Sequence, residues 1–185
     1  MLKFDIGVAI KQSGTKLDPA LLEAFIAVES GGKGFDDKTG KILIQFEPKP
    51  FFNRTQQLIE NKVDVQSKEW EAFNKAFKID SEAAMESTSI GLPQIMGFHW
   101  KRLGYDSVGA MWDDFKKGLV NQICALIKFI ETDPRLLKAF NEKDYHLMAM
   151  YYNGAGYAAQ AHKLGIKPYN EQLKAYYENL TKTPR

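Results

Sequence analysis

The stretch LLEAFIAVESGGKG, from Leu21 to Gly34, determines how the rest of the chain is interpreted. Its apolar residues recur at helical spacing, and Asp18 and Pro19 before it suit a helix N-cap and a first-turn proline. The glycines after Ser30 end the helix, because glycine readily takes the left-handed backbone conformation found at helix ends. Glu29 therefore falls in the last turn, where the negative end of the helix dipole is expected to raise the pKa of its carboxyl. A raised pKa suits a general acid, although most carboxylates at helix ends are solvated surface groups.

The length and composition fit one domain over residues 1–185. The apolar and charged fractions, 44% and 26%, are ordinary for a globular protein with its own core. A net charge of +2, without an arginine-rich run, does not predict a nucleic-acid partner. The single cysteine, Cys124, excludes a disulfide within the chain, and its apolar surroundings in the sequence predict a buried, inert thiol. We therefore expect a monomeric single domain.

Metal, cofactor and membrane sites are not predicted. His99, His146 and His162 are too scattered to resemble a structural zinc motif, and no other pattern indicates a cofactor. The N-terminal residues lack the apolar core and cleavage site of a signal peptide, and no apolar run reaches membrane length. These features predict a chain made in the cytoplasm without stable membrane insertion. If it acts outside the membrane, another component must release it.

One or two short strands, which would form a small hairpin, are predicted in an otherwise helical chain. Residues Lys41–Glu47 alternate between apolar and polar side chains, and the prolines at 48 and 50 end this pattern. Further helices are expected over 55–61 and 67–77, and a strongly apolar helix over Asp114–Glu131 is expected at the centre of the core. The remaining helices are predicted after Asp133, after Asp144, from Tyr157 to Gly165 and from Pro168 to Leu180. The fold class is therefore mainly α, a helical domain around a central buried helix with a small β-hairpin insertion.

Three short motifs follow one another along the chain: ESGG from Glu29, GLPQIM from Gly91 and YNG from Tyr152. Together they resemble the lysozyme-like superfamily, which includes goose-type lysozymes and soluble lytic transglycosylases. The longer segments AVESGGKGF, ILIQFEPKPFF, STSIGLPQIMGF and YYNGAGY are similar to the N-acetylmuramidase domain of phage endolysins. This resemblance extends from about Leu21 to Tyr177. The four longer segments in the same order make this resemblance specific.

The resemblance implies an α+β lysozyme-like fold and hydrolysis of the β-1,4 bond between N-acetylmuramic acid and N-acetylglucosamine. The partner would be the glycan strands of peptidoglycan, and the domain would act on the cell wall after its release. Such cleavage needs an acid for the leaving oxygen and a second group on the other face of the sugar. Glu29 matches the acid of the family, and Asp37 and Thr55 match the residues with the second role. Because Asp36 is adjacent to Asp37, either of the two could be this second carboxylate. The alternative for both aspartates is a structural role in a turn.

Glu47 ends the predicted strand on the side opposite its apolar residues. The family commonly has Phe-Glu-Arg-His at this point, whereas this chain has Phe46-Glu47-Pro48-Lys49, so the glutamate matches and the Arg-His pair does not. A carboxylate facing the substrate and close to Glu29 would raise the pKa of that residue, or would serve as a base or a sugar ligand. The alternative is an exposed acid at a strand end.

Substrate-binding residues are predicted in the two later motifs. Gln94 carries an amide that can both donate to and accept from a sugar, and Pro93 suits a first helical turn. Tyr152 and Asn153 place an aromatic ring beside an amide, and Ser89 is expected to line the same cleft. An internal tether for Gln94 and a core position for Tyr152 are the alternatives. At the level of function, the alternatives are a lytic transglycosylase that forms a 1,6-anhydro product and a cell-wall-binding module without activity.

Overall fold

The computed structural model describes residues 2–62 and 65–182, which group into two compact units. The first unit combines the chain up to Gly32 with the chain from Ile123 onward, and the second contains the chain from Lys33 to Gln122. The first unit is therefore discontinuous in sequence, with the second inserted into it. That the two units form one functional domain stays a prediction.

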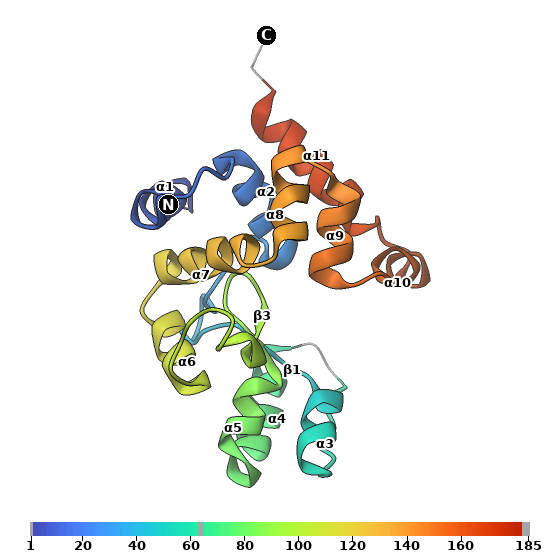
Figure 1. Ribbon diagram of the computed structural model, residues 1–185. Coiled ribbons are helices and arrows are strands. Elements are labelled where there is room, and N and C mark those ends of the chain that lie inside the picture. Colours follow the sequence, from blue (N-terminus) through green and yellow to red (C-terminus); the bar gives the residue numbers. More distant parts are fainter. Residues whose placement is uncertain (1, 63–64, 183–185) are drawn as a thin grey trace. The chain divides into compact units, whose positions relative to one another are not determined.

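Helices make up the first unit in the residues described (Figure 1). α2 packs against α1 and α11, and α9 packs against α8 and α11. The helices with residues in this unit are α1 (Leu2–Ser13), α2 (Pro19–Ser30), α7 (Leu119–Glu131), α8 (Pro134–Glu142), α9 (Tyr145–Asn153), α10 (Tyr157–Leu164) and α11 (Tyr169–Thr181).

Local sequence signals set the ends of these helices as predicted. The Asp18 carboxylate accepts hydrogen bonds from the backbone N–H groups of Ala20 and Leu21 at 2.9 and 3.4 Å, and α2 begins at Pro19. Gly31 ends α2 in the left-handed conformation, with φ 62°. Side-chain caps also begin α8 and α9, at Asp133 and Asp144. The boundaries of α2 thus place Glu29 in the last turn.

Phe25 lies at the centre of the aromatic core of the first unit and is fully buried. Its ring centroid is 4.6 Å from that of Tyr152 on α9, 5.2 Å from Phe140 on α8 and 5.8 Å from Tyr169 on α11. Aromatic pairs at these separations contribute about 0.5–1.5 kcal/mol each beyond their burial. Phe25 therefore holds α2 against three helices from the C-terminal half of the chain.

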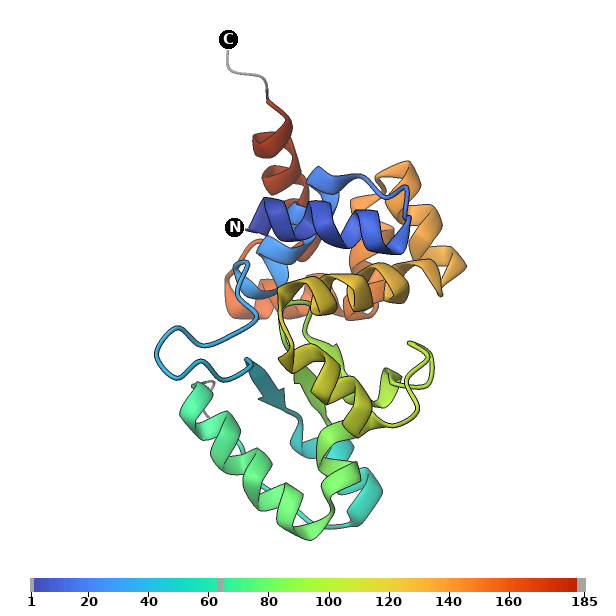
Figure 2. The ribbon, with the colours of Figure 1, turned by 90° about the vertical axis from the view of Figure 1, so that its left-hand side faces the viewer.

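The second unit contains a small sheet with helices around it (Figure 2). The sheet is antiparallel in the order β1-β2-β3, and Gln45 pairs with Ser89 and Ile90 with Ile95. Helix α4 packs against β1 and α5. The elements of this unit are β1 (Ile44–Phe46), α3 (Pro48–Thr55), α4 (Gln66–Ile79), α5 (Ser81–Glu86), β2 (Thr88–Ile90), β3 (Ile95–Met96), the 3₁₀ helix η1 (Gly97–His99), α6 (Val108–Lys116) and the first turn of α7.

The sheet differs from its prediction in extent. Of the predicted strand over Lys41–Glu47, only Ile44–Phe46 is a strand, although Ile42, Ile44 and Phe46 are buried as expected. The other two strands come from residues 88–96. The interpretation of Pro93 as part of a first helical turn is wrong, because residues 91–94 form the turn that joins β2 and β3.

Two helix predictions are also wrong. The helix expected over 55–61 instead occupies Pro48–Thr55, because the two prolines suit the first turn of a helix as well as the end of a strand. The single helix expected over Asp114–Glu131 is divided into α6 and α7, because Gly118 has φ 155°, a conformation that breaks the helix. Cys124 on α7 is only partly buried. The mainly helical class and the small sheet are confirmed.

Candidate active site

The carboxyl of Glu29 is held by two side chains from the C-terminal part of the chain. The Tyr169 hydroxyl, at the start of α11, donates a hydrogen bond to Glu29 Oε1. The Asn153 side chain, at the end of α9, also hydrogen-bonds this carboxyl. The sequence motifs predicted that Glu29 and Asn153 belong to one site, and the first unit brings them together.

Burial raises the pKa of the Glu29 carboxyl from 4.5 to about 7, while its hydrogen bonds with Tyr169 and Asn153 act in the opposite direction. Burial disfavours the charged form, and the two hydrogen bonds favour it. The predicted direction is confirmed, but burial rather than the helix dipole is the main cause. At neutral pH this carboxyl therefore exchanges readily between its acid and carboxylate forms.

Tyr152 and Asn153 have different surroundings although they are adjacent. The Tyr152 ring packs edge-on against Phe25, and its centroid lies 5.3 Å from that of Phe129. Asn153 is the last residue of α9 and is followed by Gly154, whose φ is 88°. Asn153 thus reaches the Glu29 carboxyl, whereas the geometry of Tyr152 favours a core position.

Tyr169 is the contact that sequence reasoning missed. It lies 140 residues after Glu29, and nothing local distinguishes it from the other tyrosines of the last helix. Burial raises the pKa of the Tyr169 hydroxyl well above 10, and the nearby charge of Glu29 raises it further. Its hydroxyl therefore remains a hydrogen-bond donor throughout the working range of an enzyme.

In the second unit, Glu47 lies directly after β1 and before the first residue of α3. Burial raises its pKa, and the nearby charge of Glu69 raises it further. Glu69 itself is only 2% exposed, and its carboxylate accepts hydrogen bonds at 2.7 Å from the backbone N–H of Phe46 and from Asn61 Nδ2. Glu69 is a second residue that the sequence did not indicate. It fixes the end of β1 just before Glu47.

The structure gives Asp36 and Asp37 different surroundings. The Asp36 carboxylate accepts hydrogen bonds from the backbone N–H and the hydroxyl of Thr39, both at 2.8 Å, and so stabilises a turn. Asp37 is exposed and forms an ion pair with Lys33. Of the two, Asp37 is less involved in the local backbone.

The remaining predicted residues make local contacts. The Thr55 hydroxyl, at the end of α3, donates to the Phe51 carbonyl at 2.9 Å. Ser89 Oγ donates to Gln94 Oε1 at 3.0 Å, and Gln94 Nε2 donates to the Gly91 carbonyl at 2.7 Å. Ser89 and Gln94 are therefore brought together across the β2–β3 turn, and these contacts favour a tether for the Gln94 amide.

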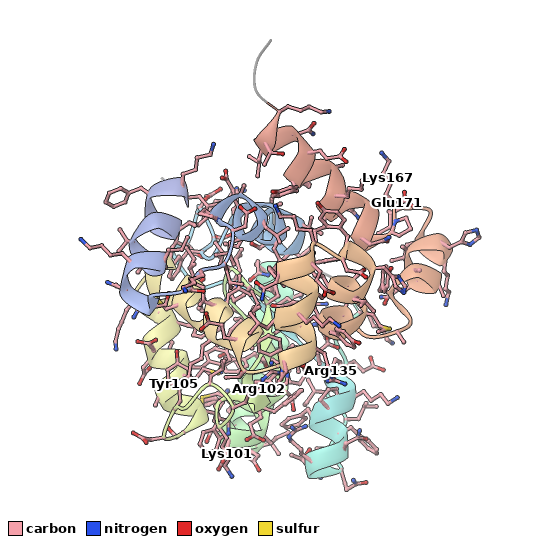
Figure 3. All side chains as sticks on the ribbon, turned by 45° about the horizontal axis from the view of Figure 1, so that its top comes forward. Lys101, Arg102, Tyr105, Arg135, Lys167 and Glu171 are labelled. Atoms are coloured by element: carbon pink, nitrogen blue, oxygen red, sulfur yellow. The ribbon has the colours of Figure 1, made fainter. Side chains whose placement is uncertain are left out.

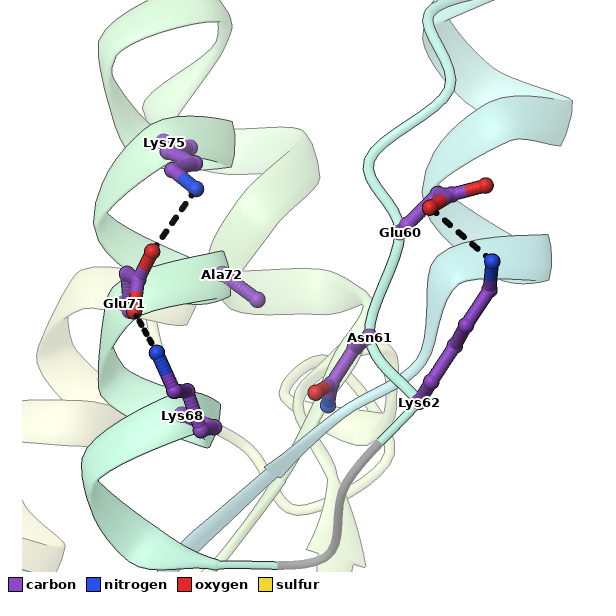
Figure 4. Close-up of a pocket in the computed structure, with 7 residues that line it drawn as sticks. All are labelled: Glu60, Asn61, Lys62, Lys68, Glu71, Ala72 and Lys75. Carbon is purple, nitrogen blue, oxygen red and sulfur yellow. Dashed lines mark hydrogen bonds and ion pairs between the residues drawn. The ribbon is translucent and has the colours of Figure 1, made fainter.

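A separate hollow on the second unit lies between α4 and the loop that carries Glu60, Asn61 and Lys62 (Figure 4). Its charged side chains pair with one another: Glu71 with Lys68 and Lys75, at 2.8 and 2.9 Å, and Glu60 with Lys62. The two lysines lower the pKa of Glu71 to about 2. None of the predicted site residues lines this hollow, and its paired charges do not favour acid–base chemistry.

Within residues 2–62 and 65–182, no group of three or more histidine, cysteine, aspartate or glutamate side chains is arranged to hold a metal ion. Nor does any helix in these ranges combine the length and apolar character that crossing a bilayer requires.

Comparisons with known proteins agree with the fold and with the motifs. A family model described as N-acetylmuramidase matches residues 18–181. The crystal structure of the Burkholderia AP3 phage endolysin is similar, with a TM-score of 0.80 and 28% sequence identity over 98% of this chain and 71% of that chain. No curated protein gives a significant match. Since the family model covers most of the sequence, the chain belongs to the N-acetylmuramidase family and has a lysozyme-like endolysin fold.

Proposed function

We propose that Glu29 is the general acid of this peptidoglycan-degrading N-acetylmuramidase. Glu29 would protonate the leaving oxygen of the β-1,4 bond between N-acetylmuramic acid and N-acetylglucosamine. Water would then supply a hydroxyl group to the anomeric carbon of the muramic acid, and its remaining proton would return to a carboxylate. The observation that carries this proposal is the partly buried Glu29 carboxyl at the end of α2, which hydrogen-bonds with Tyr169 and Asn153 and has a pKa of about 7.

The surroundings of Glu29 suit both halves of this proton transfer. Burial keeps a large fraction of the carboxyl protonated at neutral pH. Once the proton has left, hydrogen bonds with Tyr169 and Asn153 stabilise the carboxylate. Together they keep the pKa close to the working pH, which is where a general acid is most effective.

For the second carboxylate, the candidates are Asp37 and Glu47. The resemblance favours Asp37 together with Thr55. The raised pKa of Glu47 and its place beside the buried Glu69 support a role as base or sugar ligand. Ser89 and Asn153 are proposed to contact the sugar. Gln94 and Tyr152, whose contacts favour a tether and a core position, are proposed to position these two neighbours.

We further propose that the two units work as one muramidase domain and that the domain acts as a monomer on glycan strands, without a nucleic-acid partner. The family match supports this, because residues 18–181 include parts of both units. Sedimentation of the active protein at the assay concentration would test the monomer.

The first experiment is digestion of purified peptidoglycan by the wild type, by Glu29→Gln and by Glu23→Gln, with mass spectrometry of the soluble products. Glu23 lies on the same helix as Glu29 and provides a matched control. We expect hydrated reducing-end muramic acid from the wild type and from Glu23→Gln, and none from Glu29→Gln. A 1,6-anhydro product would show a transglycosylase, and activity retained by Glu29→Gln would exclude its role as acid. Binding without digestion by the wild type would indicate a wall-binding module.

The second carboxylate can be identified with Asp37→Asn, Glu47→Gln and, as a neighbouring control, Asp36→Asn. Removing the true second carboxylate is expected to lower kcat by at least a hundredfold. Sodium azide, a small nucleophile, should then restore cleavage and give a glycosyl azide whose anomeric form reports the stereochemistry. If neither Asp37→Asn nor Glu47→Gln lowers kcat, both assignments are wrong.

A further inference from the structure

A pocket of about 330 Å³ opens on the first unit beside the partners of Glu29. It lies between α10, the loop that follows it and the first turns of α11, and Val28 of α2 and Asn153 of α9 complete its wall. Its volume is at the lower end of the range for small-ligand sites, about 300–1,000 Å³, and is large for a single acetamido group. None of the residues predicted from the sequence, other than Asn153, lines this pocket.

The pocket and the proposed acid share two side chains. Asn153 and Tyr169 line the pocket, and both hydrogen-bond the Glu29 carboxyl. A group that fills the pocket therefore contacts the residues that hold the acid. Such a group would be a substituent of the sugar on which Glu29 acts, rather than an unrelated molecule.

The lining combines apolar, amide and cationic groups. Leu164 and Ile166 contribute apolar side chains that are 62% and 54% exposed and therefore available to a ligand. Gln160 and Gln172 contribute amides, and Gln172 Nε2 also donates to the Lys167 carbonyl at 2.7 Å, which holds the loop against α11. Lys167 supplies the positive charge. Figure 3 shows its side chain with that of Glu171 at the junction of α10 and α11.

This combination fits a short peptide better than a sugar. An N-acetylglucosamine residue carries no anionic group and no alkyl side chain, so it would use neither Lys167 nor the exposed Leu164 and Ile166. The lactyl group of muramic acid, in contrast, carries a peptide stem with alanine methyl groups, amides and free carboxylates. The methyl groups would contact the apolar side chains, the stem amides would hydrogen-bond with the glutamines, and a carboxylate would form an ion pair with Lys167.

We propose that this pocket is a subsite for the peptide stem of muramic acid, with Lys167 paired to a stem carboxylate. The proposal rests on the proposed function, since it takes Glu29 as the group that acts on the same sugar. It makes the enzyme selective for strands that still carry their peptides over strands from which an amidase has removed them.

The test compares digestion of stem-bearing and amidase-stripped glycan strands prepared from the same sacculi. The wild type is expected to show a higher kcat/KM on stem-bearing strands by about fivefold or more, the size of one ion pair with its neighbouring apolar contact. Lys167→Met keeps the length of the side chain and removes its charge, so it should lower this ratio by the share that the ion pair contributes. Lys163→Met, on α10 but outside the pocket, should leave the ratio as in the wild type.

Binding separates a failure of this proposal from a failure of the Glu29 assignment. In the Glu29→Gln background, cosedimentation with the two strand preparations should still favour stem-bearing strands, and the addition of Lys167→Met should weaken that preference. The proposed subsite would be wrong if the wild type and Lys167→Met showed the same ratio of kcat/KM on the two kinds of strand. It would also be wrong if the protein bound both kinds of strand equally well. Activity retained by Glu29→Gln would overturn the acid but not the stem preference.

Discussion

Replacing Glu29 with Gln should stabilise the protein at alkaline pH while it removes activity. The folded state raises the pKa of this carboxyl from 4.5 to about 7. Between these two values the folded protein holds a proton that the unfolded chain has released. The wild type therefore loses stability as the pH rises through this range, and the loss is complete above pH 7. Glutamine, which stays neutral, does not have this cost.

The magnitude follows from the pKa. Each pKa unit corresponds to ~1.4 kcal/mol, so the ionised carboxylate destabilises the folded state by about 3 kcal/mol at pH 8. The partners can accommodate the amide, because the Tyr169 hydroxyl can donate to its oxygen just as it donates to the acid. For a protein whose whole stability is about 5–15 kcal/mol, this gain is large.

The assay is urea unfolding of the wild type and Glu29→Gln at pH 4.5 and pH 8, followed by circular dichroism. The difference in unfolding free energy between the two proteins cancels the titration of all other groups. It should be close to zero at pH 4.5 and about 3 kcal/mol in favour of the variant at pH 8. A difference that does not change with pH, or a variant less stable at pH 8, would refute the assignment of a raised pKa to Glu29.

Three further substitutions test the surroundings of the two carboxyls and the packing of the second unit. Tyr169→Phe removes a hydrogen bond that lowers the pKa of Glu29. The alkaline limb of the pH dependence of kcat/KM should therefore move up by about one pH unit, and a downward shift would contradict the geometry. Glu69→Gln removes the charge that raises the pKa of Glu47. The pKa of Glu47, measured by NMR titration of its carboxyl, should therefore fall, whereas an unchanged pKa would show that burial alone raises it. In Gly97→Ala the new Cβ would lie 2.0 Å from the Met85 carbonyl oxygen, and we expect a loss of about 3 kcal/mol in unfolding free energy. Gly7→Ala, in the middle of α1 with open space around it, is the control and should gain about 0.5–1 kcal/mol.

The features that the sequence predicted well are those determined by neighbouring residues. Asp18 and Pro19 set the start of α2 and Gly31 its end, because caps and left-handed glycines act over a few residues. This was enough to place Glu29 in a last turn. The alternation of Ile42, Ile44 and Phe46 likewise predicted which side of this segment is buried.

The features that failed depend on distant parts of the chain or on one unusual backbone angle. The observed strand is shorter than the predicted one because a strand extends only as far as its partner, here Thr88–Ile90, and no local pattern reports that pairing. The apolar pattern on both sides of Gly118 is continuous and indicates a single helix, but the backbone angle of Gly118 divides that helix in two. Tyr169 and Glu69 act on carboxyls far away in sequence, so no local pattern distinguishes them from ordinary helix residues.

The order of the chain has a consequence for the time at which the enzyme becomes active. Tyr169 follows Glu29 by 140 residues, and the whole second unit is synthesised between them. At translation rates of about 5–20 residues per second, the proposed acid waits roughly 7–30 s on the ribosome for this partner. Until then α2 has no α11 to pack against, and the Glu29 carboxyl lacks its hydrogen bond from Tyr169. A chain that ends before α11 lacks these contacts, and we expect it to digest peptidoglycan more slowly than the full chain.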